Sequence, residues 1–479
     1  QVIVVSQPLN DNTNILKEEE VIAALEATIN APYEAYVDEV ITEPLIEKLP
    51  APGSIKSTSK NDVMGTTEFI LSNGVKVILK TTDFKADEIG LTAFRKGGKQ
   101  TYSKDQAADV LLMPLAVELS KLGNFDINMM KKYLAGKTVS LGYSVNNYTD
   151  MLEGSSSVKD FGSMMEVLYA YFTALNPDEE KYQTQIEQYK PILANNEKLP
   201  NSIFARERAK TTYGDNPLMA NLDVATLEKA NYSNMLSMAK KSLENAADYT
   251  FIFVGNIDEA TLRPMLEQYI ATLPSKAKAS ECKVVTNIDP VRGKVENKFD
   301  VAMQTPSTIV FNMYSGNNLK WDVKNDLMID LMGDVLDMVF VETLREDEGG
   351  TYGASVSALY NFSNNIWQLI YAYQTAEDKL ERMEARADKE LEDLLKNGAK
   401  ADHFNKVKEA AIKQYEINSK TNSYWEGAIM SAERGANTYA GYIEALQSLT
   451  LDEFNNFLKN VYDGKNLIEV IMIGKQAAE

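Results

Sequence analysis

Residues 251–255, Phe-Ile-Phe-Val-Gly, and residues 470–474, Val-Ile-Met-Ile-Gly, are two uninterrupted apolar runs that end on a glycine. Short apolar runs bounded by turn residues are typical of buried strands. Gly255 and Gly474 lie 219 positions apart, which is about the length of one domain. The two runs therefore predict two units of related fold, each closing on a buried strand. A chance likeness between short β-rich runs is the alternative.

A third run of the same kind, Val-Ile-Val-Val, occupies residues 2–5 and has no domain before it. If the repeat holds, residues 2–5 are the last strand of a preceding domain. The chain opens on Gln1 rather than Met, so we expect it to begin inside a longer gene product.

The predicted elements between these runs alternate between strands and helices. Residues 69–71 and 75–80 form a β-hairpin, because the Asn-Gly pair at 73–74 favours a turn with positive φ. In the first unit we expect further strands at 89–94 and 249–255, and helices at 104–122, 128–135, 158–174, 178–194 and 259–272. In the second unit we expect strands at 295–299, 307–313, 352–360, 366–374 and 467–474, and helices at 324–344, 377–395 and 401–419.

This pattern predicts an α+β fold with two related domains, each a mostly antiparallel sheet with helices packed on one face. We expect residues 1–65 to be a linker from a missing amino-terminal half, followed by domains at 66–285 and 286–479. A length of 479 residues exceeds what one core supports, which agrees with this division.

The composition excludes several classes of function. The net charge of −20 argues against a nucleic-acid partner, which would require clustered Lys and Arg. No stretch approaches the roughly 18 apolar residues of a transmembrane helix, so none is expected. His403 is the only histidine and Cys282 the only cysteine, so a zinc site built on two imidazoles or on a cysteine cluster is excluded within the chain. His403 stands at a predicted helix start and is expected to be solvated.

The candidate functional residues lie where a predicted long helix ends and a strand begins. Residues 344–353 read Leu-Arg-Glu-Asp-Glu-Gly-Gly-Thr-Tyr-Gly. A helix end that leads through a tight turn into a strand can bring Arg345 and Tyr352 to one edge of a sheet. Arg offers a planar fork of donors and Tyr a hydroxyl on a rigid ring, which suits a peptide carbonyl, a carboxylate or a developing oxyanion. Alternatively, Arg345 pairs with Glu342, Glu346 or Glu348, and Tyr352 only packs at a strand start.

The motif at 344–352 resembles the Arg and Tyr motif in the last domain of insulinase/pitrilysin-type (inverzincin) zinc peptidases, and other stretches match in the same order. Residues 71–85 resemble the opening of the third domain of the bacterial members, and residues 251–258 and 269–274 resemble its end. Residues 422–425, Asn-Ser-Tyr-Trp, resemble a helix motif of the fourth domain. The match covers about residues 66–474.

The resemblance implies that this chain is the carboxyl-terminal half of such a peptidase. In that family the amino-terminal half holds zinc through a His-x-x-Glu-His helix and a distant Glu, and the other half closes the chamber over peptide substrates. The helix in the corresponding position here, about residues 105–122, contains no histidine. This half alone is therefore expected to bind no metal, to contain no complete catalytic set and to be inactive.

By the same resemblance, zinc-bound water attacks the peptide carbonyl, with a Glu of the other half as base. Arg345 and Tyr352 are then expected to bind substrate and support the oxyanion. The expected partners are the amino-terminal half and a peptide, and a periplasmic or cell-envelope location is expected. The alternative function is a catalytically silent structural or peptide-binding protein of the same fold.

Overall fold

The computed structural model describes residues 2–6, 15–32, 41 and 43–476, which divide into two compact units at residues 42 and 43. In the amino-terminal unit the helix α1 (Glu18–Ile29) is closed at its start by Glu20, whose carboxylate accepts a hydrogen bond from the backbone N–H of Lys17. Residues 2–6 have no regular secondary structure, and the Val2 side chain is 93% exposed. The expectation that residues 2–5 are the last strand of a preceding domain stays a prediction, because the strands it would pair with are not among the described residues.

The larger unit, residues 43–479, contains a seven-stranded sheet with the order β1-β2-β3-β9-β4-β7-β6. Only the β3–β9 pair is parallel. The strands are β1 (Ile55–Asn61), β2 (Thr66–Leu71), β3 (Lys76–Thr81), β4 (Ile89–Lys96), β6 (Val139–Val145), β7 (Thr149–Ser156) and β9 (Tyr249–Gly255). The β2–β3 hairpin turns at Gly74, whose φ of +84° confirms the Asn-Gly turn.

A five-stranded sheet follows, with the order β10-β14-β11-β13-β12. Only the β10–β14 pair is parallel. The strands are β10 (Lys294–Met303), β11 (Thr308–Gly316), β12 (Ala354–Asn361), β13 (Ile366–Thr375) and β14 (Asn466–Gln476). We call the two sheets sheet 1 and sheet 2 in chain order.

The two sheets have the same topology, which confirms the expected repeat. In sheet 1 the five strands β3-β9-β4-β7-β6 lie side by side in this order. Numbered by their order along the chain, they are the first, fifth, second, fourth and third of the five. Sheet 2 shows this order in β10-β14-β11-β13-β12, and in both sheets the first and last strands form the single parallel pair. The buried closing runs that end at Gly255 and Gly474 therefore occupy equivalent central strands, β9 and β14.

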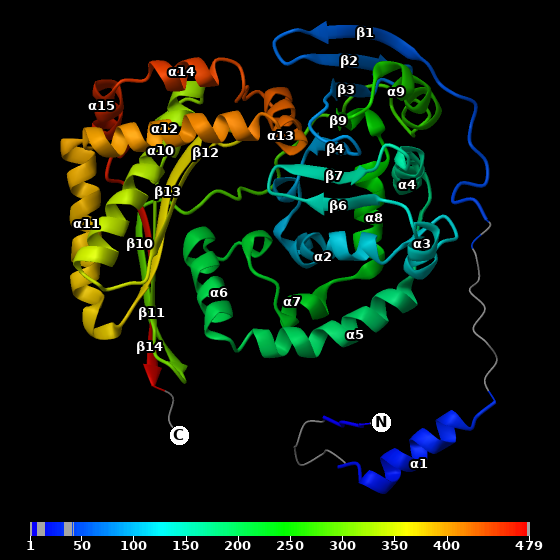
Figure 1. The fold of residues 1–479 in the computed structure, drawn as a ribbon, viewed down its shortest axis with the longest axis horizontal. Coiled ribbons are helices and arrows are strands. Elements are labelled where there is room, and N and C mark those ends of the chain that lie inside the picture. The colour runs from blue at the N-terminus through cyan, green and yellow to red at the C-terminus, as the bar shows by residue number, and fades with distance from the viewer. Residues whose placement is uncertain (1, 7–14, 33–40, 42, 477–479) are drawn as a thin grey trace. The chain divides into compact units, whose positions relative to one another are not determined.

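Apart from α6 and α13, helices of each repeat pack on one face of its own sheet (Figure 1). The first repeat contains α2 (Ala107–Glu118), α3 (Ile127–Tyr133), α4 (Phe161–Thr173), α5 (Glu179–Asn196), α6 (Pro200–Tyr213), α7 (Val224–Lys229), α8 (Tyr232–Leu243) and α9 (Glu259–Met265). The second repeat contains α10 (Val323–Phe340), α11 (Leu380–Asn397), α12 (Ala401–Asn418), α13 (Asn422–Glu433), α14 (Tyr442–Ser448) and α15 (Leu451–Val461). A short pair, β5 (Lys121–Leu122) and β8 (Leu175–Asn176), lies outside both sheets.

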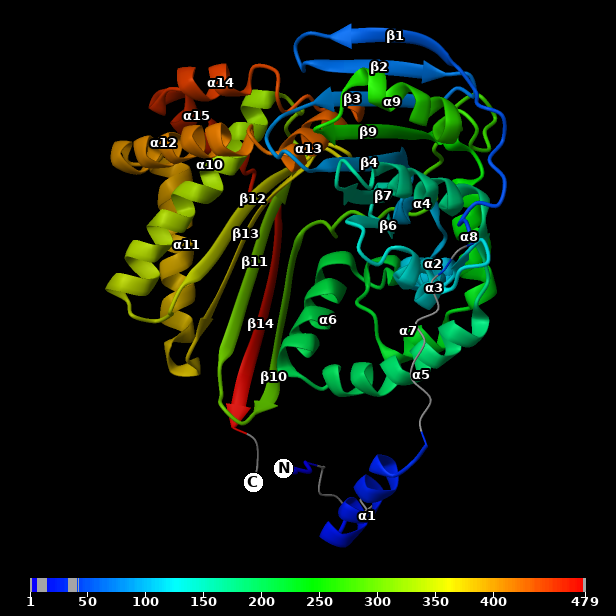
Figure 2. The ribbon, with the colours of Figure 1, turned by 45° about the vertical axis from the view of Figure 1, so that its right-hand side comes forward.

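The other face of each sheet is covered by a helix of the other repeat. The helix α13 packs on β4 and β9 of sheet 1, where Trp425 and Ile429 join a buried cluster with Phe94 and Ile252. The helix α6 packs on β10 and β14 of sheet 2 (Figure 2). Its Phe204 is buried in a cluster with side chains of β11 and β14. The two repeats thus exchange one helix each, and the exchanged helix covers central strands of the other repeat's sheet.

The sequence prediction missed β6 and β7, and it placed the ends of other helices and strands at different residues. Strand β1 pairs with β2, so sheet 1 begins at Ile55, inside the stretch expected to be a linker. The proposed limits 1–65, 66–285 and 286–479 remain a prediction, and residues 1, 7–14, 33–40, 42 and 477–479 lie outside the described residues. No helix in the described part of the chain is both long and apolar enough to span a bilayer.

Candidate functional site

The segment that carries Arg345 is a continuation of the helix α10. The helix starts at the N-cap Asp322, whose carboxylate accepts hydrogen bonds from two backbone N–H groups, and it widens into the π-helix η6 (Val341–Asp347). Leu344 is fully buried, so this turn is fixed to the core, while Arg345, the next residue, is exposed. The sequence signal for this arrangement is an amphipathic helix that stops at two glycines.

The chain reverses after this helix through Gly349 and Gly350. Gly349 has φ of +54°, a conformation that glycine adopts without strain. A Cβ at Gly350 would lie 1.9 Å from the sulfur of Met383, so any larger residue there would require the buried Met383 side chain to shift. Tyr352 follows in the loop before β12, and its side chain is 101% exposed. The tight turn predicted from the Gly-Gly pair is present, although β12 begins two residues after Tyr352.

Neither Arg345 nor Tyr352 makes a side-chain hydrogen bond or ion pair within the described part of the chain. Two of the three carboxylates that sequence reasoning offered to Arg345 have other partners. Glu342 Oε1 lies 3.1 Å from Nε2 of His403 on α12. Glu348 Oε2 lies 3.0 Å from Nε of Arg382, and its Oε1 lies 3.4 Å from Nη1 of Arg386. Both donors of the candidate site are therefore open to solvent.

His403 is buried, with 3% of its surface exposed, which corrects the expectation of a solvated side chain. It lies in the first turn of α12, but this turn packs against the π-helix η6, so one ring nitrogen contacts Glu342 and the other, Nδ1, has no partner. Helix position alone did not reveal this burial, because the packing partner comes from 61 positions earlier in the chain.

The residues present do not fit a zinc ion. The helix α2, which corresponds in order to the metal-binding helix of the resemblance, buries the apolar side chains of Val110, Leu112 and Met113. No group of three or more His, Cys, Asp and Glu side chains within the described residues is arranged to hold a metal ion. Nothing in the described part of this chain therefore supplies the ligand set of a zinc peptidase.

Sequence reasoning also missed a cavity of about 700 Å³ beside α10. Asp326, Asp330 and Asp334 line one wall at intervals of one helical turn, and Tyr415 and Tyr442 line another. The surrounding protein displaces water and raises the pKa of Asp326 to about 6 and that of Asp330 to about 8. The spacing of the aspartates was visible in the sequence, but the cavity depends on α12, α13 and α14.

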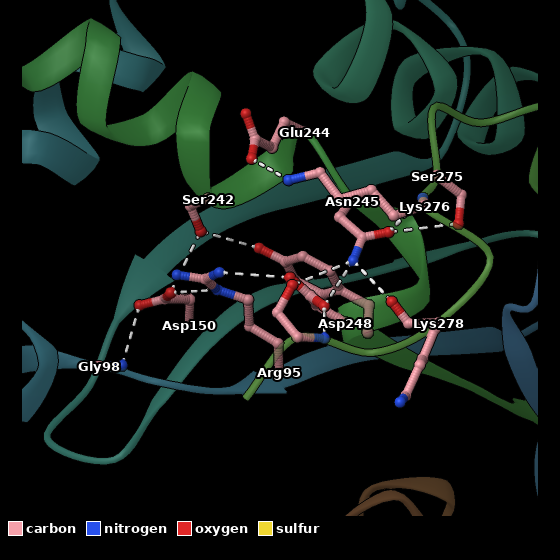
Figure 3. A network of polar contacts seen from close by, with 12 residues as sticks. Arg95, Gly98, Asp150, Ser242, Glu244, Asn245, Asp248, Ser275, Lys276 and Lys278 are labelled. Atoms are coloured by element: carbon pink, nitrogen blue, oxygen red, sulfur yellow. Dashed lines mark hydrogen bonds and ion pairs between the residues drawn. The ribbon is translucent and has the colours of Figure 1, made fainter. Parts of the chain in front are cut away.

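A buried polar network ties the connection between the repeats to sheet 1 (Figure 3). Asp150 is fully buried and accepts hydrogen bonds from Nε of Arg95 at 2.6 Å, from the backbone N–H of Gly98 at 3.2 Å and from Ser242 at 3.1 Å. The carboxylate raises the pKa of Arg95 and offsets the cost of its burial.

Next to this pair, Asn245 Nδ2 donates to Asp248 at 2.7 Å and to the backbone carbonyl of Lys278 at 3.0 Å. The network shows how the segment after α9 is held. All its members have protein partners, so it is interpreted as structural.

Comparisons with known proteins agree with the fold. The family described as "Peptidase M16 inactive domain" matches residues 235–411. A protein of Arabidopsis thaliana named "Zinc protease PQQL-like" is 23% identical over 452 residues, which cover 90% of this chain and 43% of that protein. The chain thus spans less than half the length of this relative.

Two solved proteases show the same fold at greater length. The periplasmic protease PqqL from Escherichia coli has a TM-score of 0.79 at 16% identity, covering 96% of this chain and 51% of PqqL. The ferredoxin protease FusC, solved as a mutant in complex with Arabidopsis ferredoxin, has a TM-score of 0.78 at 17% identity, covering 97% of this chain and 51% of FusC.

Proposed function

We propose that this chain, which belongs to the insulinase/pitrilysin-type (M16) peptidase family and corresponds to its carboxyl-terminal half, is the substrate-binding half of a zinc metalloendopeptidase. The proposed partner is an amino-terminal half that holds the zinc ion, and the proposed substrate is a peptide. The name of the PqqL structure, a periplasmic protease, supports a proposed location in the periplasm or cell envelope.

The observation that carries the proposal is the state of Arg345 and Tyr352. Both side chains are exposed, and both keep their donors free of other protein groups in the described structure. A purely structural arginine in this position would pair with Glu342, Glu346 or Glu348, yet no ion pair joins Arg345 to any of them within the described residues. Two of these carboxylates, Glu342 and Glu348, are bound by His403, Arg382 and Arg386 instead.

When zinc is bound in the other half, it supplies a Lewis acid and an activated water. In the proposed role, this chain's part is to hold the peptide. The guanidinium of Arg345 and the hydroxyl of Tyr352 donate hydrogen bonds to carbonyl oxygens of the substrate. These bonds strengthen as negative charge develops on the reacting oxygen, so they lower the barrier more than they tighten ground-state binding.

The test is kcat/KM beside thermal unfolding for Arg345→Ala and Tyr352→Phe in the full-length enzyme. Loss of one oxyanion donor lowers turnover by about 100-fold or more in well-studied cases. The melting temperature should not move, because an exposed side chain without partners contributes little to stability.

Arg263→Ala is the control, since it removes an arginine from the i,i+4 ion pair with Glu259 on α9. Unchanged activity in both site variants, or a loss only in step with stability, would reject the site. A silent structural or peptide-binding role would then be favoured.

A further inference from the structure

Arg345 stands close in sequence to acidic residues with which it could form an ion pair. Glu342 and Glu348 each stand three residues from Arg345, one on either side. Side chains three residues apart on a helix lie within reach of each other, and opposite charges at this spacing attract. An arginine captured in this way would have to break an ion pair before it could bind a substrate.

Each of these two carboxylates is held by a different helix. Glu342 is bound by His403 of α12 at 3.1 Å. Glu348 is bound by two side chains of α11, Arg382 at 3.0 Å and Arg386 at 3.4 Å. Nη2 of Arg382 also donates to the backbone carbonyl of Glu348 at 3.2 Å. Arg382 therefore holds the backbone of Glu348 as well as its carboxylate.

The turn that follows is held by α11 and by residues just before it, between the end of β13 and the start of α11. Nη2 of Arg386 lies 3.1 Å from Asp347, and Nζ of Lys379 donates to the carbonyl of Gly349 at 2.9 Å. Thr375 Oγ1 donates to the carbonyl of Gly350 at 2.8 Å, and this bond is buried. Every residue from Asp347 to Gly350 is thus held by a side chain located between positions 375 and 386.

We propose that His403, Arg382 and Arg386 are positioning residues that occupy Glu342 and Glu348 and thereby keep the guanidinium of Arg345 free for substrate. This inference rests on the proposed function, because it explains why Arg345 makes no ion pair by its role in binding substrate. Arg382 and Arg386 act through Arg345 and touch no substrate themselves.

The experiment uses the full-length enzyme and an internally quenched, unstructured peptide of mixed sequence as the probe. In the double variant Arg382→Gln/Arg386→Gln, Glu348 loses both cations and becomes available to Arg345. An exposed ion pair of this kind shifts an equilibrium by up to about fivefold, so kcat/KM should fall by about that factor. Lys389→Gln is the matched control, since Lys389 lies on α11 and its ion pairs within the described residues are with Glu390 and Asp393.

The decisive variant adds Glu348→Gln to the double variant. If Arg382 and Arg386 act by occupying Glu348, its removal leaves Glu342, which His403 still binds, as the only carboxylate three residues from Arg345. The value of kcat/KM should then return to within about twofold of the wild type. If they merely brace the turn, the triple variant has lost still more contacts and stays as slow as the double variant or slower. That result would overturn the inference. Thermal unfolding of all variants separates these effects from loss of fold.

The single variant Arg345→Ala distinguishes failure of this inference from failure of the proposed function. If Arg345→Ala has wild-type kcat/KM, the substrate-binding role proposed for Arg345 is wrong and the inference falls with it. If Arg345→Ala is slow while Arg382→Gln/Arg386→Gln is not, the proposed function stands and only the positioning role is rejected.

Discussion

Thr92 on β4 donates a hydrogen bond to Glu426 on α13, with 2.9 Å between Oγ1 and Oε2 across 334 positions of sequence. This bond fixes a helix of the second repeat on the sheet of the first. Asn422, at the start of the same helix, accepts from Thr82 at 2.6 Å and donates to Glu88 at 3.0 Å. Through the exchange of α6 and α13, the central strands of each sheet are covered on one face by a helix of the other repeat.

The titration of Glu426 should make stability depend on pH. Burial raises the pKa of Glu426 from 4.5 to about 7. A raised pKa means that the folded protein binds this proton more tightly than the unfolded chain does. Protonated Glu426 therefore adds stability at low pH, and this contribution is lost as the pH rises from about 4.5 to about 7. Glu426→Gln should abolish this pH-dependent decrease in the free energy of unfolding. The decrease is on the order of 1–2 kcal/mol, because the side chain is partly exposed.

The measurement for Glu426→Gln is the free energy of unfolding in urea at pH 5 and pH 8. The variant should match the wild type at pH 5 and exceed it at pH 8. Asp326 and Asp330 titrate in both proteins, so their contributions to the free energy of unfolding cancel when the variant is compared with the wild type. An equal difference at the two pH values would contradict the raised pKa.

The packing of α13 should be essential to sheet 1. Trp425 is 6% exposed and packs with Met64, Ile78 and Phe94, and its indole N–H donates to the carbonyl of Ser419 at 2.9 Å. Trp425→Ala should lower the free energy of unfolding by about 3–5 kcal/mol, because it leaves a cavity and an unpaired carbonyl. Ile417→Ala, at a side chain that is 61% exposed, should change it by less than about 0.5 kcal/mol. Similar losses in both variants would argue that α13 does not pack on the sheet.

The network around Arg95 should be sensitive to loss of one charge. In Asp150→Asn the guanidinium of Arg95 stays mostly buried without its countercharge, so stability should fall by about 3–5 kcal/mol. Asp402→Asn removes the carboxylate of an exposed i,i+4 pair with Lys406 and should cost less than about 0.5 kcal/mol. Denaturant unfolding measures both. Combining Asp150→Asn with Arg95→Met should cost less than the sum of the single variants, and strict additivity would show that the two side chains are not coupled.

The chain alone should neither bind zinc nor hydrolyse peptides. With one histidine and one cysteine, it cannot supply the ligand set of a zinc peptidase. Equilibrium dialysis with metal analysis should find no site of sub-micromolar affinity, and the purified chain should not cleave the quenched peptide. Cleavage that a chelator stops would contradict this prediction.

The local features of the fold could be predicted from the sequence because they depend on neighbours in the chain. The Asn73-Gly74 hairpin and the buried strands β9 and β14 follow from turn chemistry and apolar runs. The missed strands β6 and β7 contain glycines and several polar residues, and they form because β4 offers an edge to pair with.

The sequence by itself determined that two repeats are present, that the chain lacks a zinc ligand set, and that Arg345 and Tyr352 flank a glycine turn at the end of a long helix. These conclusions rest on residue identity, spacing and composition, which act over short stretches of chain. Only the tertiary structure decided that α6 and α13 cover each other's sheets, that His403 is buried against Glu342, and that Arg382 and Arg386 hold Glu348 away from Arg345. Those contacts join residues tens to hundreds of positions apart, and an ion pair forms between whichever charges packing brings together.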